Sequence, residues 1–159
     1  MKHNAIGKTF AIGAVVALAL GLAPSVRAEA KIEGKTCSAA TIKGAFARRD
    51  TGFVIAPNAA GMFLAGVSLM TFDGNGAYTS VGFGSLNGNQ MQSSGKGTYT
   101  VNPDCTGHYE PEVAPPGRTG QAFFVIVDDG NGLEILPLDQ GASINCVARR
   151  TPAAGDAKD

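Results

Sequence analysis

Short apolar segments alternate with polar turns along most of the chain. Runs rich in β-branched and aromatic residues are separated by clusters of Gly, Asn, Asp and Pro, and helical periodicity is scarce after residue 43. This spacing is typical of strands that are joined by tight turns. It predicts eight strands, over residues 44–55, 62–72, 78–85, 95–101, 107–113, 121–127, 133–138 and 142–149.

The turn residues predict how these strands are connected. The sequence Asp-Gly-Asn-Gly occurs twice, from Asp73 and from Asp129, and Gly and Asn supply the positive φ angles that hairpins need. Consecutive hairpins give an antiparallel meander, which predicts an all-β fold, a small closed barrel of about eight strands. A β-sandwich is the alternative. Neither copy continues into a calcium-binding EF-hand loop, so both are interpreted as turns.

Residues 1–28 have the pattern of a cleaved signal peptide. Lys2 and Lys8 precede an uncharged run over 10–23, and small residues follow up to Ala28. The run is too short to span a membrane as a helix. The protein is therefore predicted to be exported, to the periplasm or the extracellular space, with no membrane span after cleavage. The barrel domain would cover 29–150, and the Ala-, Gly-, Pro- and charge-rich tail over 151–159 is predicted to be disordered.

Cleavage changes the charge of the chain. It removes three of the 13 basic residues and none of the 13 acidic ones, which leaves a formal charge of −3. A weakly acidic domain lacks the clustered Lys and Arg that bind nucleic acid or anionic lipid, so neither partner is predicted. His108 is the one histidine that remains. The usual Cys/His zinc sites cannot form around a single histidine, and neither a metal nor another cofactor is predicted.

The cysteines are Cys37, Cys105 and Cys146. In an oxidising compartment a disulfide is the default, and one thiol is left over. Successive turns of a meander alternate between the two ends of the sheet, which places all three cysteines near one end. A Cys37–Cys105 bridge is preferred because it would tie the N-terminal segment across that end. A Cys37–Cys146 bridge stays open as the alternative, since barrel closure sets the first strand beside the last.

The two ends of the predicted barrel differ in character. At the cysteine end, residues 35–43 are predicted to form one helical turn that plugs the barrel, with Thr36 or Ser38 as its N-cap. The opposite end carries longer loops and is the expected mouth, where ligands enter small barrels. Its candidate polar groups are Asn58, Asn87, Gln90 and Arg118.

The leading functional hypothesis is a non-enzymatic barrel that binds a small, largely apolar molecule in its lumen. The strand register places four candidate ligand contacts inside, and Arg118 is the candidate at the mouth. The four are Phe46, Met70, Phe72 and Tyr99.

A second hypothesis is a cyclase- or isomerase-type enzyme that uses the same lumen. His108 and Glu110 lie on either side of Tyr109 in the same predicted strand, so their side chains point to the opposite face of the sheet. If Tyr109 faces the core, His108 and Glu110 are predicted to face solvent. With the register reversed, His108 and Glu110 would line the lumen as an acid/base group. Arg48 and Asp50 share a parity as well and are interpreted as a surface ion pair.

A third hypothesis is a structural or interaction module. The strand over 122–127 is apolar on both faces, whereas a closed barrel buries only one face. The N-terminal segment or a second subunit would have to cover the other face. A homodimer is therefore predicted.

Two motifs resemble those of a known family. They are Phe-Asp-Gly-Asn-Gly at 72–76 and Gly-Thr-Tyr-Thr-Val-Asn-Pro-Asp-Cys-Thr-Gly at 97–107, flanked by similar stretches at 37–44 and 124–128. Together they resemble a widespread family of small exported bacterial proteins of unestablished function, across most of the mature chain. The resemblance implies a calycin-type or allene-oxide-cyclase-like β-barrel and brings no catalytic residues with it. Because the family has a cysteine both in the stretch that matches 37–44 and in the motif that matches 97–107, the resemblance also favours the Cys37–Cys105 pairing.

Overall fold

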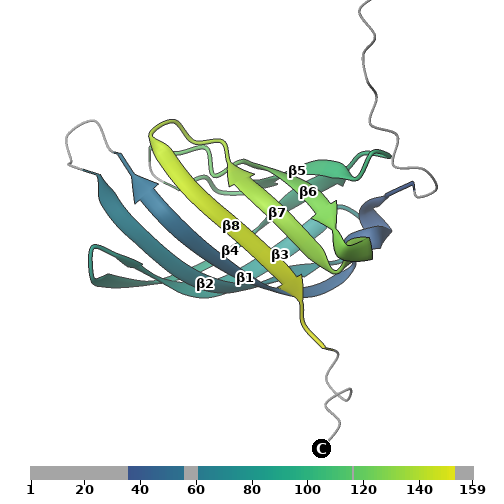
Figure 1. Cartoon of the computed structure of the whole chain (residues 1–159), viewed down its shortest axis with the longest axis horizontal. Coiled ribbons are helices and arrows are strands. Elements are labelled where there is room, and N and C mark those ends of the chain that lie inside the picture. The colour runs from purple at the N-terminus through teal and green to yellow at the C-terminus, as the bar shows by residue number, and fades with distance from the viewer. Residues whose placement is uncertain (1–35, 56–60, 116, 153–159) are drawn as a thin grey trace, which may run out of the picture. The chain divides into compact units, whose positions relative to one another are not determined.

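The computed structural model describes residues 36–55, 61–115 and 117–152 (Figure 1). The predicted signal peptide, Asn58 at the expected mouth and residues 153–159 of the predicted tail lie outside these ranges. Eight strands and two short 3₁₀ turns form the described part. The strands are β1 (Gly44–Val54), β2 (Met62–Phe72), β3 (Ala77–Leu86), β4 (Asn89–Val101), β5 (Thr106–Pro111), β6 (Ala122–Val127), β7 (Gly132–Pro137) and β8 (Ala142–Arg150), and the turns are η1 (Ala39–Ile42) and η2 (Asp128–Gly130).

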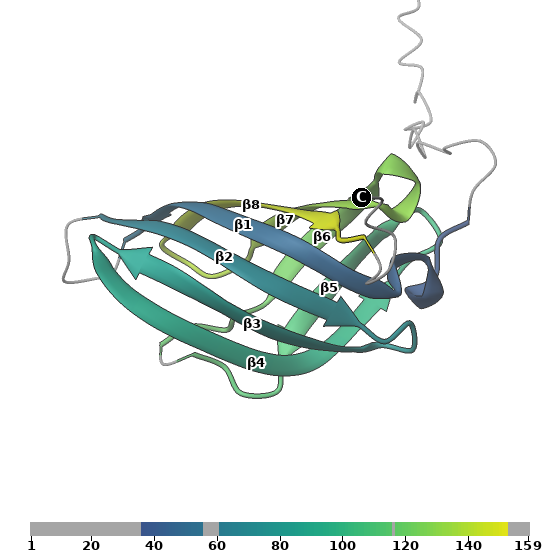
Figure 2. The same cartoon turned by 90° about the horizontal axis from the view of Figure 1, so that it is seen from below.

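The strands close into a barrel in chain order. Each strand pairs antiparallel with the next, and β1 also pairs antiparallel with β8, so that Phe46 lies opposite Arg150 and Val54 opposite Ala142. Figure 2 shows β1 to β4 side by side along one wall. The predicted all-β meander barrel is confirmed, and the sandwich alternative is wrong. Closure pairs both edges of the sheet, which a sandwich would leave open.

The strand boundaries agree with the sequence prediction except in β4. Instead of beginning at residue 95, β4 begins at Asn89 and extends the hairpin with β3 by six residues. The turn consists of Asn87 and Gly88, both at positive φ, which is the geometry of a tight two-residue hairpin. Residues 89–94 are polar except for Met91, so their composition resembles that of a loop although their backbone pairs with β3.

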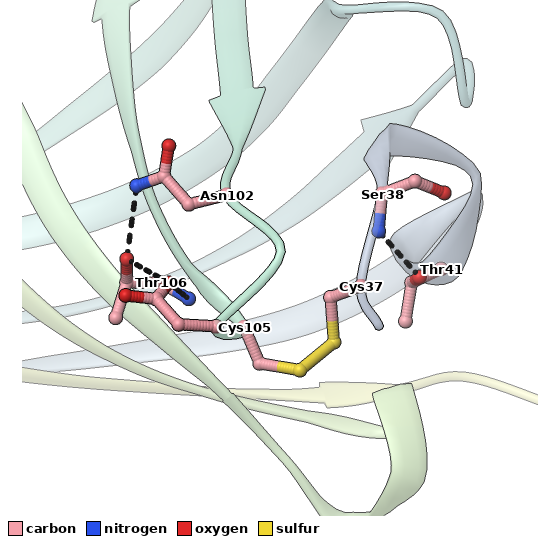
Figure 3. Close-up of a disulfide and its surroundings, with 7 residues drawn as sticks. Cys37, Ser38, Thr41, Asn102, Cys105 and Thr106 are labelled. Carbon is pink, nitrogen blue, oxygen red and sulfur yellow. Dashed lines mark hydrogen bonds between the residues drawn. A yellow bond between two sulfur atoms is a disulfide. The ribbon is translucent and has the colours of Figure 1, made fainter. Parts of the chain in front are cut away.

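The barrel has two dissimilar ends, which we call the disulfide end and the loop end. At the disulfide end, Cys37 and Cys105 form a disulfide with their Cα atoms 4.9 Å apart, which confirms the preferred pairing (Figure 3). The predicted helical turn is present there as η1. The Ser38 N–H donates to Thr41 Oγ1 at its start, and Ile42 is fully buried.

Large aromatic side chains fill the barrel next to the disulfide end. Phe46 packs edge-on against Phe72, with ring centroids 5.6 Å apart, and Phe72 packs against Tyr99 at 5.0 Å. The Tyr99 hydroxyl donates to the Ala39 carbonyl of η1 and accepts from the Gly74 N–H. This aromatic core holds η1 and the β2–β3 turn together. The loop end of the lumen is lined differently.

Within residues 36–55, 61–115 and 117–152, no helix is long and apolar enough to cross a membrane.

Candidate functional site

The inner wall of the barrel changes character halfway along β2 and β3. Beyond the buried Met70 and Tyr78, the next inward positions of these strands are Gly or Ser, until Met62, Leu64 and Leu86 end the row at the rim. The Gly and Ser positions are Gly66, Ser68, Ser80, Gly82 and Gly84. We call this surface the small-residue wall. Because these five residues carry no bulky side chain, they leave space in the lumen next to the side chains of the facing strands.

An arginine faces this wall from inside the barrel. Arg48 lies beside Ser68 in the β1–β2 register, and Asp50 lies beside Gly66. Arg48 Nε donates to Asp50 Oδ1 at 2.6 Å, and the two side chains are only 17% and 18% exposed. The interpretation of this pair as a surface ion pair is therefore wrong. Both residues share the parity of Phe46, which points into the core, and mutual pairing makes burial of the two charges tolerable.

The remaining guanidinium nitrogens reach Tyr109 across the lumen and two residues on the strands next to β1. Arg48 Nη1 donates to the Tyr109 hydroxyl of β5 at 2.6 Å and contacts Met70 Sδ at 3.7 Å, while Nη2 contacts Cys146 Sγ of β8 at 3.4 Å. We call these five residues the Arg48 cluster: Arg48, Asp50, Met70, Tyr109 and Cys146. The cluster separates the filled disulfide end of the lumen from the small-residue wall. Arg48 and Asp50 remain partly exposed, so water reaches the cluster.

The surroundings fix the protonation of this cluster. Burial raises the pKa of the Tyr109 hydroxyl to about 12 and that of the Cys146 thiol to about 12, although the Arg48 charge acts in the opposite direction on both. Burial acts to lower the pKa of Arg48, but Tyr109, Asp50 and Cys146 outweigh it and the pKa of Arg48 is raised. At neutral pH the cluster therefore holds one cation and two protonated neutral groups beside the Asp50 carboxyl.

Tyr78 adds a further polar group next to the cluster. Its ring lies 5.2 Å from that of Tyr109, and its side chain is 6% exposed. Burial raises the pKa of Tyr78, and the nearby Arg48 charge opposes this shift. Among the described residues, the Tyr78 hydroxyl makes no hydrogen bond, and no side-chain oxygen or nitrogen that is sealed from solvent lacks a partner. The Tyr78 hydroxyl is therefore an unused polar group that water can reach.

The four lumen residues that the sequence singled out point inward as expected. Phe46, Met70, Phe72 and Tyr99 are each at most 3% exposed. Three of them form the aromatic core at the disulfide end, and Met70 touches Arg48.

The predicted mouth residues hold the loops of the loop end. Arg118 Nε donates to Asp139 Oδ2 at 3.2 Å, and Asp139 Oδ1 accepts from Thr119 N–H, Thr119 Oγ1 and Gly120 N–H. Asp139 is buried, and although burial opposes the effect, these hydrogen bonds lower its pKa. The Asn87 side chain accepts from the Phe63 N–H at 2.8 Å. Arg118 and Asn87 thus tie loops and strand ends together at this end.

The residues of the acid/base hypothesis lie on the outer surface. His108 is exposed and contacts Thr100 Oγ1 at 2.9 Å, and Glu110 accepts from the Gln121 side chain at 3.2 Å. Their neighbour Tyr109 is buried inside. The predicted outward parity is confirmed, so neither His108 nor Glu110 lines the lumen.

The outer face of β1 to β3 carries an apolar surface that the sequence analysis did not identify. Val67 and Phe83 are 61% and 60% exposed, and the neighbouring Leu69 and Val81 are also exposed. Two adjoining grooves of about 540 and 800 Å³ run over these side chains, with Arg49 in both. On β6, Phe123 and Val125 are exposed as the sequence predicts. We call the surface formed by Val67, Leu69, Val81 and Phe83 the outer apolar patch.

Cys146 is the free cysteine of the described residues, and it is not at the disulfide end. It lies midway along β8, opposite Asp50, with its side chain in the lumen. The prediction that all three cysteines gather near one end is wrong for Cys146, because β8 continues for four residues beyond it.

We expect iodoacetamide to distinguish the three thiols. The native protein should take up no label, since Cys146 is buried and its pKa is raised to about 12, which suppresses the reactive thiolate. Unfolding without reductant should expose one reactive thiol, and unfolding with reductant three. Mass spectrometry of the labelled chain gives the counts. Rapid labelling of Cys146 in the folded protein would contradict this placement.

A scan against protein-family models, a search of curated proteins and a search of solved structures each found no match.

Proposed function

We propose that the barrel binds a small, largely apolar molecule in the loop-end half of its lumen. The observation that carries this proposal is the small-residue wall facing a partly exposed Arg48–Asp50 pair. The disulfide end fills the lumen with rings such as Phe46 and Phe72, whereas the wall itself carries only Gly and Ser, next to the partly buried Val54 and Leu64. Apolar walls with a few placed polar groups are typical of ligand pockets.

The proposal includes export of the protein. A disulfide that ties η1 to the β4–β5 turn is stable in an oxidising compartment and rare in the cytosol. This supports the signal-peptide interpretation of residues 1–28. We infer that the barrel acts in the periplasm or outside the cell, where a binding protein would capture or carry its ligand.

Two experiments test lumen binding. Native mass spectrometry of the purified protein should detect a co-purified small molecule. The neutral fluorescent probe N-phenyl-1-naphthylamine should bind the protein, and Gly66→Phe should weaken binding by about tenfold or more because its ring would occupy the lumen. A Cβ at Gly66 meets nothing closer than 3.5 Å, so a side chain can start from this position, and the circular dichroism spectrum of the variant checks that the barrel still folds.

Ala65→Phe is the matched control, since residue 65 belongs to the same strand and faces outward. It should leave lumen binding unchanged. If Ala65→Phe weakens probe binding while Gly66→Phe does not, the probe binds at the outer surface and lumen binding is rejected.

A second candidate function is protein interaction through the outer apolar patch. Contiguous exposed apolar surface of this kind marks interfaces, and we propose a second copy of the chain as its occupant. Sedimentation should then show a concentration-dependent dimer that Val67→Lys with Phe83→Lys abolishes. Ser94→Lys, on the polar strand β4, is the control. A monomer at every concentration would reject this candidate.

A further inference from the structure

The Arg48 cluster and Tyr78 form a donor-rich surface at the inner end of the proposed binding site. An arginine side chain has five N–H groups. In Arg48, four of them are used in the contacts to Asp50, Met70, Tyr109 and Cys146. One Nη2 N–H is left. The Tyr109 oxygen accepts from Arg48, so its own O–H is left to donate.

Tyr78 supplies the observation that points to a ligand. More than nine-tenths of this side chain is buried, yet its hydroxyl has no partner among the described residues and stays within reach of water. A buried hydroxyl without a hydrogen bond is costly, so such groups are normally paired with protein, water or ligand. The ring contact with Tyr109 places the unused hydroxyl beside the Arg48 cluster.

The charge balance selects the kind of group that fits. The Arg48 cation is already paired with the Asp50 carboxyl at 2.6 Å, so the pair brings no net charge to a ligand. A second carboxylate would compete with Asp50 for Arg48 and be repelled by it. A neutral oxygen acceptor meets the unused donors without that repulsion, and a carbonyl oxygen has two lone pairs to accept from two of them.

On this basis, and resting on the proposed lumen binding, we propose that the ligand is an uncharged apolar molecule with a carbonyl oxygen at its inner end, as in a ketone, aldehyde or ester. The carbonyl accepts from the Tyr78 hydroxyl and from Tyr109 or Arg48. The apolar remainder lies along the small-residue wall toward the loop end. No covalent step is involved.

The test compares three probes of equal chain length, decane, 2-decanone and decanoate, by displacement of N-phenyl-1-naphthylamine. Tyr78→Phe should weaken 2-decanone binding about fivefold, the effect of one lost hydrogen bond, and leave decane binding unchanged. Because Tyr78 has no hydrogen bond in the unliganded protein, its loss should not impair folding. Thr79→Val, a hydroxyl deletion on the opposite face of β3, should change none of the three affinities.

Infrared spectroscopy provides a direct readout. The stretching band of carbonyl-¹³C-labelled 2-decanone should move to lower frequency on binding to the wild-type protein and move part of the way back in Tyr78→Phe. Equal effects of Tyr78→Phe on decane and 2-decanone, an unshifted carbonyl band, or decanoate as the tightest ligand would each overturn the carbonyl proposal while lumen binding stands. Failure of all three probes to displace the dye, with no dye bound in the lumen, would reject both proposals.

Discussion

Replacing both Cys37 and Cys105 with serine is expected to lower the free energy of unfolding by about 4 kcal/mol. The bridge joins residues 68 positions apart, and a cross-link over a loop of this length removes much conformational entropy from the unfolded chain. It also fixes the entry to η1, whose Ile42 side chain is buried in the aromatic core. Urea unfolding, followed by circular dichroism, measures the change.

The reduced wild-type protein is the control for the disulfide prediction. It keeps both sulfur atoms and loses only the cross-link, so it should unfold at nearly the same urea concentration as the double serine variant. A loss below about 1 kcal/mol in both would mean that η1 and the β4–β5 turn hold the disulfide end without the bridge.

Asp50→Leu is expected to lower the free energy of unfolding by about 3 kcal/mol, because it leaves the Arg48 cation inside the barrel without its counter-charge. Adding Arg48→Met should restore most of the loss, since the double variant contains neither charge. Leu has about the size of Asp, and Met replaces the aliphatic part of Arg48, so both substituted side chains are apolar toward the lumen. A double-mutant cycle by urea unfolding gives the coupling between the two residues.

The Arg49→Met variant is the matched control for this cycle. Residue 49 lies next in the same strand, faces the outer grooves and makes no ion pair within residues 36–55, 61–115 and 117–152. It should change stability by less than about 0.5 kcal/mol. Additive effects of Asp50→Leu and Arg48→Met would contradict a paired charge in the lumen.

The sequence predicts the fold well where local signals are strong. The bounds of β2 coincide with the prediction, and the outward parity of His108 and Glu110 follows from the apolar character of Tyr109 alone. The polar first half of β4 was missed because its backbone pairing with β3 depends on the Asn87–Gly88 turn rather than on apolar side chains.

The Arg48 cluster was not predicted, and the reason is physical. Its members come from β1, β2, β5 and β8, which are far apart in the sequence, and Tyr109 of β5 meets Arg48 only across the lumen, where strand pairing gives no information about contacts. The shared parity of Phe46, Arg48 and Asp50 was an available signal. Unpaired charges are costly to bury, but Arg48 and Asp50 stand two residues apart on the same face of β1 and therefore pair with each other.

The long β3–β4 hairpin has a consequence for how the barrel meets its surroundings. Over residues 89–95, β4 pairs with β3 alone, because the pairing of β4 with β5 begins at Gly97, so this part of β4 leaves a stretch of sheet edge without a neighbouring strand. Exposed edges recruit strands from other molecules unless polar side chains discourage it. Asn, Gln and Ser make up most of this stretch, with Met91 as the exposed apolar exception, and we expect them to discourage edge-to-edge aggregation while the barrel wall stays open to backbone pairing at this point.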